Sequence, residues 1–118
     1  MQPNKKMDTL LNEMAVYKTE LAKGSVTSQL HRIKNIIGNI PDINISDQQG
    51  YTYLMIAVMQ YKMDIVKLLL EAGADPSLAD KPEQTAFDFA EITNADAHLI
   101  KMLEQANFRL HGVLRGVK

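Results

Sequence analysis

The chain contains no cysteine. It therefore has no disulfide, no thiol nucleophile and no zinc site built from thiolates. This absence is typical of proteins in a reducing cytosol, so we expect a cytoplasmic protein. Long apolar runs are missing as well: the longest, residues 54–59, is far shorter than the roughly 20 residues of a membrane-spanning helix. Residues 1–14 carry two lysines but no apolar core of a signal peptide, so we expect neither a signal peptide nor a membrane segment.

Motifs of catalysis and metal binding are also absent. The histidines are His31, His98 and His111, and no two of them lie three or four residues apart, as zinc-binding helices require. No glycine-rich phosphate loop is present, and no serine lies in a nucleophile elbow. Asp88 and Glu91 have the spacing of an acid–base pair on one helix face, but a solvated acidic face is the better interpretation. We expect no catalytic residue, cofactor, metal or small-molecule substrate.

Charge is unevenly distributed, although the net charge is only −1. Residues 1–40 carry a net +3, residues 71–104 a net −6 and residues 105–118 a net +3. Two interpretations are open: ordinary solvated helix faces, or an acidic patch in the C-terminal half that steers a basic partner. A basic stripe typical of nucleic-acid-binding proteins is missing, so we expect no nucleic-acid partner.

The 118 residues, 46% of them apolar, suffice for one domain with a small core. Residues 7–22 have apolar positions at helical spacing, and Gly24 is the expected stop of that helix. Ser25 or Thr27 is the expected cap of a second helix, which ends within residues 38–41. Residues 42–47 are then expected to be an extended connection.

The central stretch, residues 47–80, predicts a turn and two helices. Gly50 is free to adopt a positive φ in the turn, and Thr52 is a plausible N-cap of a short helix. Asp64 is the expected cap of the second helix, and Gly73 supplies a left-handed residue at its end. This second helix is apolar around much of its circumference, so it needs neighbours on more than one side.

The same pattern returns with a period of 33 residues. Asp47 is matched by Asp80 and Thr52 by Thr85. Three apolar positions of the second helix coincide in three copies: Ile33, Val66 and Leu99; Ile36, Leu69 and Met102; Ile37, Leu70 and Leu103. We divide the chain into repeats at about residues 7–46, 47–79 and 80–106. A basic C-terminal extension, residues 107–118, remains as either a short helix or a tail.

The central copy resembles the ankyrin-repeat family. The family pattern is Asp-x-x-Gly-x-Thr-Pro-Leu-His-x-Ala, followed by Ile-Val-x-Leu-Leu-Leu-x-x-Gly-Ala-Asp. The matching positions are Asp47, Gly50, Thr52, Leu54, Ala57 and all of residues 65–75 except the variable ones. Tyr53 replaces the family's proline and Met55 its histidine, which brings the rigidity of the turn into question but not the fold. Glu83 stands where the third copy should have glycine. End repeats diverge because one side faces water, and the resemblance covers about residues 10–106.

The resemblance implies an all-α ankyrin-repeat solenoid of helix–turn–helix units with projecting β-turn or hairpin loops, forming one domain over residues 1–118. It also implies binding of another protein through a concave face of loop tips and first helices, with Tyr51 and Met59 as exposed anchors. The candidate partner-binding residues are Gln48, Gln49, Tyr51, Met59, Gln60, Lys81, Pro82, Gln84, Ile92 and Thr93.

The expected role is an adaptor, inhibitor or neutralising partner that is a monomer or a weak oligomer. The alternatives are a secreted, bacterial effector-type ankyrin protein and a structural homo-oligomer. An enzyme on the same scaffold is disfavoured by the missing motifs.

Overall fold

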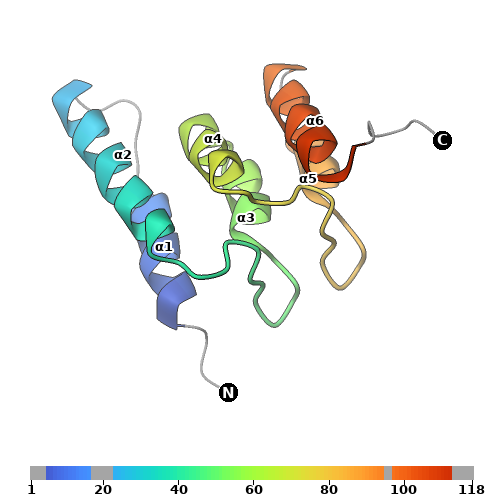
Figure 1. The fold of residues 1–118 in the computed structure, drawn as a ribbon, viewed down its shortest axis with the longest axis horizontal. Coiled ribbons are helices and arrows are strands. Elements are labelled where there is room, and N and C mark those ends of the chain that lie inside the picture. Colours follow the sequence, from blue (N-terminus) through green and yellow to red (C-terminus); the bar gives the residue numbers. More distant parts are fainter. Residues whose placement is uncertain (1–4, 17–22, 95–96, 113–118) are drawn as a thin grey trace.

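The computed structural model describes residues 5–16, 23–94 and 97–112, and these form six α-helices without a strand. The expected all-α class is therefore confirmed (Figure 1). The helices are α1 (Lys5–Val16), α2 (Lys23–Gly38), α3 (Tyr53–Met59), α4 (Met63–Glu71), α5 (Ala86–Ile92) and α6 (Ala97–His111).

Successive helices pack in pairs, α1 with α2, α3 with α4 and α5 with α6, and the pairs stack side by side. Figure 1 shows the second helices α2, α4 and α6 in one row, with the first helices behind and below them. The loops before α3 and α5 project on the side of the first helices, away from the row of second helices (Figure 1). The stack thus has two distinct faces, one of loops and first helices, the other of second helices.

The start of α3 shows how the turn remains ordered without the family's histidine. Thr52 Oγ1 accepts a hydrogen bond from the Met55 backbone N–H at 3.3 Å, and the Thr52 N–H donates to Met55 Sδ at 3.4 Å. This is a capping box in which a thioether, a weak acceptor, replaces the usual Glu or Gln. Met55, which stands in place of the family's histidine, is also buried, so the turn keeps its geometry without that histidine.

The ends of α4 support one sequence prediction and contradict another. Gly73 has φ +96°, as predicted, and the Gly73 and Ala74 N–H groups donate to Leu70 O at 3.1 Å and Leu69 O at 3.0 Å. These bonds form a complete Schellman motif. Asp64 is not the N-cap: α4 begins at Met63 and has no side-chain cap. The acidic side chain lies in the first turn instead, where it still interacts favourably with the helix dipole.

The first repeat departs most from the prediction. Among the described residues α1 ends at Val16, and residues 17–22 of the predicted helix lie outside that part of the chain. Gly24 does not stop a helix, because it lies inside α2, as do Ser25 and Thr27, the predicted caps. Gly24 is the second residue of α2 and lies in its first turn, so the interior penalty of about 1 kcal/mol for glycine does not apply in full.

The connection after α2 is a turn and not the extended segment expected from its sequence. The Ile45 N–H donates to Asp42 O at 3.3 Å, and the Asn44 N–H donates to Asp42 Oδ1 at 2.9 Å. Asn44 Oδ1 in turn accepts from the Asp75 N–H at 2.8 Å, one repeat later. The turn therefore ties the first repeat to the loop that follows α4.

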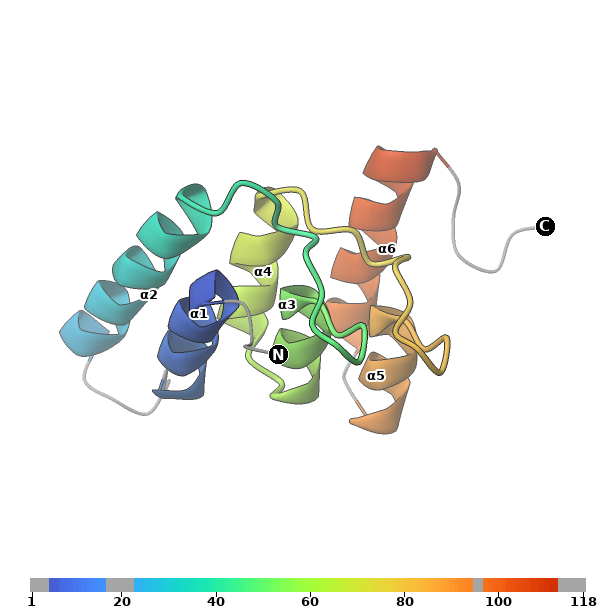
Figure 2. The same cartoon turned by 90° about the horizontal axis from the view of Figure 1, so that it is seen from below.

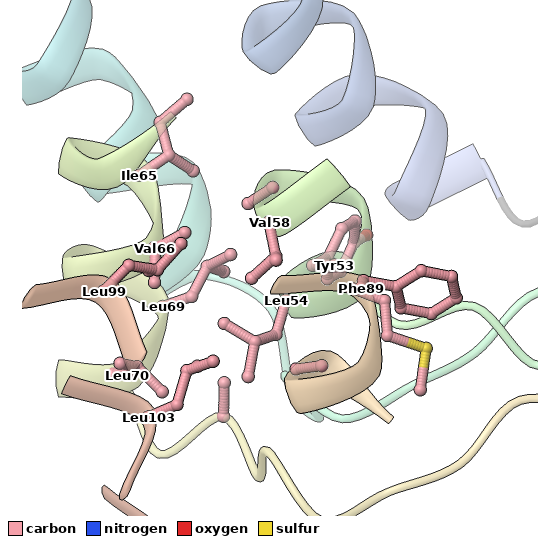
Figure 3. Packing of buried hydrophobic residues seen from close by; sticks show 14 of the residues in the cluster. Tyr53, Leu54, Val58, Ile65, Val66, Leu69, Leu70, Phe89, Leu99 and Leu103 are labelled. Carbon is pink, nitrogen blue, oxygen red and sulfur yellow. The ribbon is translucent and has the colours of Figure 1, made fainter. Parts of the chain in front are cut away.

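A single apolar core runs through the stack. Figure 3 shows Leu69 of α4 with Leu54 of α3 and Leu99 and Leu103 of α6, all of which are 0–1% exposed. Methionines contribute to this core: Met14 and Met55 are buried, and Met63 and Met102 pack partly on it. Within the described ranges no helix has the length and apolar character needed to cross a membrane.

Candidate functional site: loop tips and first helices

The first projecting loop, residues 46–52, is closed by hydrogen bonds to Asp47. Its Oδ1 accepts from the backbone N–H groups of Gln49 and Tyr51, each at 2.9 Å. The Asp47 N–H donates to Tyr51 O at 3.0 Å, and the Gly50 N–H donates to Asp47 O at 3.0 Å. One aspartate therefore organises both sides of the loop, which explains why it stands at the start of the repeat.

The second loop repeats this geometry around Asp80, which is 5% exposed. The Gln84 N–H donates to Asp80 Oδ1 at 2.7 Å, and the Asp80 N–H donates to Gln84 O at 2.9 Å. Glu83, which replaces the expected glycine, adopts φ +70°, close to the +87° of Gly50. Left-handed backbone costs a non-glycine residue about 1–2 kcal/mol, so the surrounding hydrogen bonds hold the loop in its repeat geometry.

The two loops pack against each other. The Lys81 N–H donates to Gln49 O at 3.0 Å, and a Cβ at Gly50 would lie only 2.8 Å from Asp80 Cα. The loops are seen beside each other, in green and orange, in Figure 2. Glycine is thus required at position 50 for two reasons, the positive φ and the close approach of the next loop. The tips of the two loops therefore form one connected platform.

The predicted partner-binding residues divide into two groups by burial. Exposed side chains are found at the tips of both loops and at the far ends of α3 and α5. The exposed residues are Gln48, Gln49, Gln60, Lys81, Pro82 and Ile92, whereas Tyr51, Met59, Gln84 and Thr93 are half-buried.

The expectation that Tyr51 and Met59 are exposed is wrong. Both side chains pack partly on the core, and the Tyr51 ring meets the Phe89 ring edge-on, with centroids 6.0 Å apart and planes at 65°. The partner ring comes from the next repeat, so stacking of the repeats contributes to the burial of Tyr51. We therefore expect replacement of either residue to reduce stability. Their contact with a partner stays a prediction.

Tyr61 is an exposed aromatic residue that the sequence analysis left out of the site. It follows the end of α3, is 47% exposed and has φ +54°. Asn94, 33 residues later, has φ +56°, so the left-handed residue belongs to the repeat itself. Asparagine tolerates this backbone whereas tyrosine is an outlier. The sequence did contain a signal for this position: Tyr61 aligns with Asn94 at the 33-residue period, and asparagine is a residue that tolerates left-handed backbone. With Ile92, which is 65% exposed, Tyr61 adds apolar surface to the first-helix side.

Several acidic residues of the C-terminal half make internal hydrogen bonds. Asp80 organises the second loop, and Asp88 Oδ2 accepts from the Thr85 N–H at 2.8 Å in a capping box. Asp88 is therefore a structural residue at the start of α5, and the pairing of Asp88 with Glu91 for acid–base work finds no support. Steering of a basic partner by this half stays a prediction.

A cluster of Asp75, Ser77 and His111 was missed, because 36 residues separate its ends. His111 Nε2 lies 2.9 Å from Asp75 Oδ1 and 3.1 Å from Ser77 Oγ, and Ser77 Oγ donates to Asp75 Oδ1 at 2.7 Å. In a catalytic triad the acid and the serine contact different ring nitrogens. Here both contact Nε2, so the cluster is a clamp that ties the end of α6 to the loop after α4.

The clamp predicts a pH dependence. Burial raises the pKa of Asp75, but hydrogen bonds from His111 and Ser77 outweigh this effect, so the pKa lies below its ordinary value of 3.8. The unfolded chain therefore binds more protons near this pH, and Asp75 contributes stability that is lost as the pH falls through its lowered folded pKa. We expect the carboxyl resonance of Asp75 to titrate below pH 3.8, and His111→Ala to raise that midpoint. An unchanged midpoint in the variant would contradict the clamp.

Comparison with known proteins agrees with this geometry. The family model "Ankyrin repeats (3 copies)" matches residues 21–109. The rat protein "Ankyrin repeat and SAM domain-containing protein 6" is 37% identical over 87 residues, which are 72% of this chain and 10% of that protein. The rat "Oxysterol-binding protein-related protein 1" is 40% identical over 78 residues, 64% of this chain and 8% of that protein. "Protein lin-12" of Caenorhabditis elegans is 30% identical over 80 residues, 68% of this chain and 6% of that protein.

The chain thus spans a tenth or less of the length of each of these three relatives. Ankyrin repeats are, in general, non-catalytic modules that bind other proteins. The 33-residue period, the paired helices, the stacked aspartate loops and the matching family model agree: the chain belongs to the ankyrin-repeat family.

Proposed function

We propose that this protein is a non-enzymatic adaptor, inhibitor or neutralising partner that binds another protein through its loop tips and the exposed side of its first helices. The observation that carries the proposal is the bond between the loops, from the Lys81 N–H to Gln49 O at 3.0 Å. A rigid platform loses little conformational entropy on binding, so more of its contact energy appears as affinity.

The chemistry of the platform supports a protein partner. Its tips carry the exposed polar side chains Gln48 and Gln49, and Lys81 and Glu83 on either side of Pro82. Ile92, at the far end of α5, adds a 65% exposed apolar side chain. Exposed apolar side chains that lie on the same side as polar ones are typical of protein interfaces. Cytoplasmic location and the lack of catalytic activity stay predictions that accompany this proposal.

The test is a comparison of two variants used as bait in the source-cell lysate. The first, called the platform variant, is Lys81→Glu with Ile92→Asp, which changes one exposed residue of the loop tips and one at the far end of a first helix. The matched control, Lys34→Glu, reverses one exposed charge on α2, in the row of second helices. Bound proteins are identified by mass spectrometry, and the affinity of the recovered partner is then measured by calorimetry.

We expect the platform variant to bind the partner about 30-fold more weakly, which corresponds to about 2 kcal/mol for a hot-spot residue. The control should bind within about twofold, and both variants should melt near the wild-type temperature because surface substitutions usually change stability by about 0.5 kcal/mol or less. An equal loss of affinity in both variants would contradict binding through the loop tips and first helices. A partner that both variants bind with wild-type affinity would show that the interface lies elsewhere.

A further inference from the structure

A groove lies between α4 and α6, in the row of second helices. Two adjoining hollows, of about 270 and 400 Å³, share Leu70, Glu71 and Arg109 in their walls. Figures 1 and 2 both show α4 and α6 side by side, and the loops project from the other side of the stack. From His98 to Arg109 the groove follows α6 over a rise of roughly 16 Å, at 1.5 Å per residue.

The floor of the groove is apolar and its rim is charged. Leu70 and Ala106 are 7% and 1% exposed, and Met102 is half-buried. Methionine adapts its shape to different apolar partners. The rim carries two exposed cations, Lys67 and Arg109, against one exposed carboxylate, Glu71.

Within the described part of the chain neither Lys67 nor Arg109 forms an ion pair, whereas Arg32 pairs with Glu13 at 3.0 Å. Lys67 and Arg109 are therefore available to carboxylates of a partner, and the neighbouring His98 offers ring nitrogens for further hydrogen bonds. The partner that complements this rim has more acidic than basic groups.

We propose that this groove binds an acidic amphipathic helix of another protein. A helix satisfies its own backbone hydrogen bonds, which is required here because α4 and α6 offer side chains and no strand edge. We number the partner helix from its first carboxylate, at position i. Its two apolar residues at positions i+3 and i+4 would contact Leu70 and Met102. Carboxylates at positions i and i+7, on the same helix face, would contact Lys67 and Arg109. This surface is separate from the loop platform, and its occupation does not depend on the proposed function.

The test uses a synthetic peptide of about 16 residues, held helical by a side-chain cross-link because short isolated helices are marginal in water. It carries Glu at i and i+7 and Leu at i+3 and i+4, and a second peptide carries Lys in place of both Glu residues. Binding of each labelled peptide is measured by fluorescence anisotropy. The protein variants are Lys67→Glu with Arg109→Glu, and the matched control Lys101→Glu, an exposed residue of α6 that does not line the groove.

We expect saturable binding of the acidic peptide to the wild type, and at least tenfold weaker binding to the groove variant. The control should bind within about twofold, and the groove variant should prefer the basic peptide. Changes at Lys81 and Ile92 should leave peptide binding unchanged, which separates this result from failure of the platform. No saturable binding, equal binding of both peptides to the wild type, or equal loss in the Lys101→Glu control would overturn the proposal. A dimer in sedimentation that the groove variant abolishes would overturn it as well, because the occupant would then be a second copy.

Discussion

Leu69→Ala is expected to lower the free energy of unfolding by about 2–5 kcal/mol, the range for large-to-small changes in a core. Leu69 is fully buried on α4 and points toward Leu54 of α3, with Leu99 and Leu103 of α6 nearby (Figure 3). Truncation would leave a cavity where the second and third repeats meet. Urea denaturation followed by circular dichroism measures the loss. The matched control is Leu110→Ala, a 47% exposed leucine of α6, which should change stability by about 0.5 kcal/mol or less.

The same variant tests whether the stack unfolds as one unit. Three repeats that each depend on their neighbours should unfold together, so Leu69→Ala should move the whole transition to lower urea without splitting it. Fluorescent labels at exposed positions of α2 and α6 should report the same midpoint. An early transition at α6 with an unchanged transition at α2 would contradict the single core and show that the repeats unfold separately.

Gly50→Ala is expected to cost roughly 2–4 kcal/mol, which combines the strain of a left-handed residue with overpacking. Gly50 has φ +87°, and an added Cβ would lie 2.8 Å from Asp80 Cα and 2.9 Å from Lys81 N. Both atoms belong to the backbone, so neither can rotate away. The loops must separate, which also weakens the bond from the Lys81 N–H to Gln49 O.

Gly73→Ala is the matched control for this change. Gly73 has φ +96°, but a Cβ there would have no atom within 4 Å. It should therefore show only the conformational cost, about 1–2 kcal/mol. The difference between the two variants, measured by thermal and urea unfolding, reports the contact between the loops. Equal losses would mean that the loops separate without cost and would remove the support for a rigid platform.

The sequence alone determined the repeat, its period and the local signals at its ends. Thr52, Gly50 and Gly73 act through their own backbone conformation and bonds to residues a few positions away, and such short-range effects are present in any chain with that order of residues. The apolar positions shared at 33-residue spacing likewise predicted Leu69 as a core residue, which is confirmed.

Local signals failed where packing opposed them. Gly24 was expected to end a helix, yet it lies within α2, because propensity is weak compared with the burial of an apolar face. Asp64 was expected to cap α4, but the helix begins at Met63 and Lys62 is at the N-cap position. A single carboxylate can lie at the N-cap or in the first turn with similar benefit, so the sequence does not distinguish the two.

The tertiary structure alone decided what lies between repeats. From the sequence Tyr51 was expected to be an exposed loop residue. In the structure Phe89, from the next repeat, packs against its ring. Asp75 and His111 are 36 residues apart and meet only because α6 stacks beside α4. The groove lined by Leu70 and Met102 has the same origin. Periodicity specifies the face that each helix buries. Which side chains from different repeats meet depends on the angle and distance at which the helices pack, and these follow from the whole core.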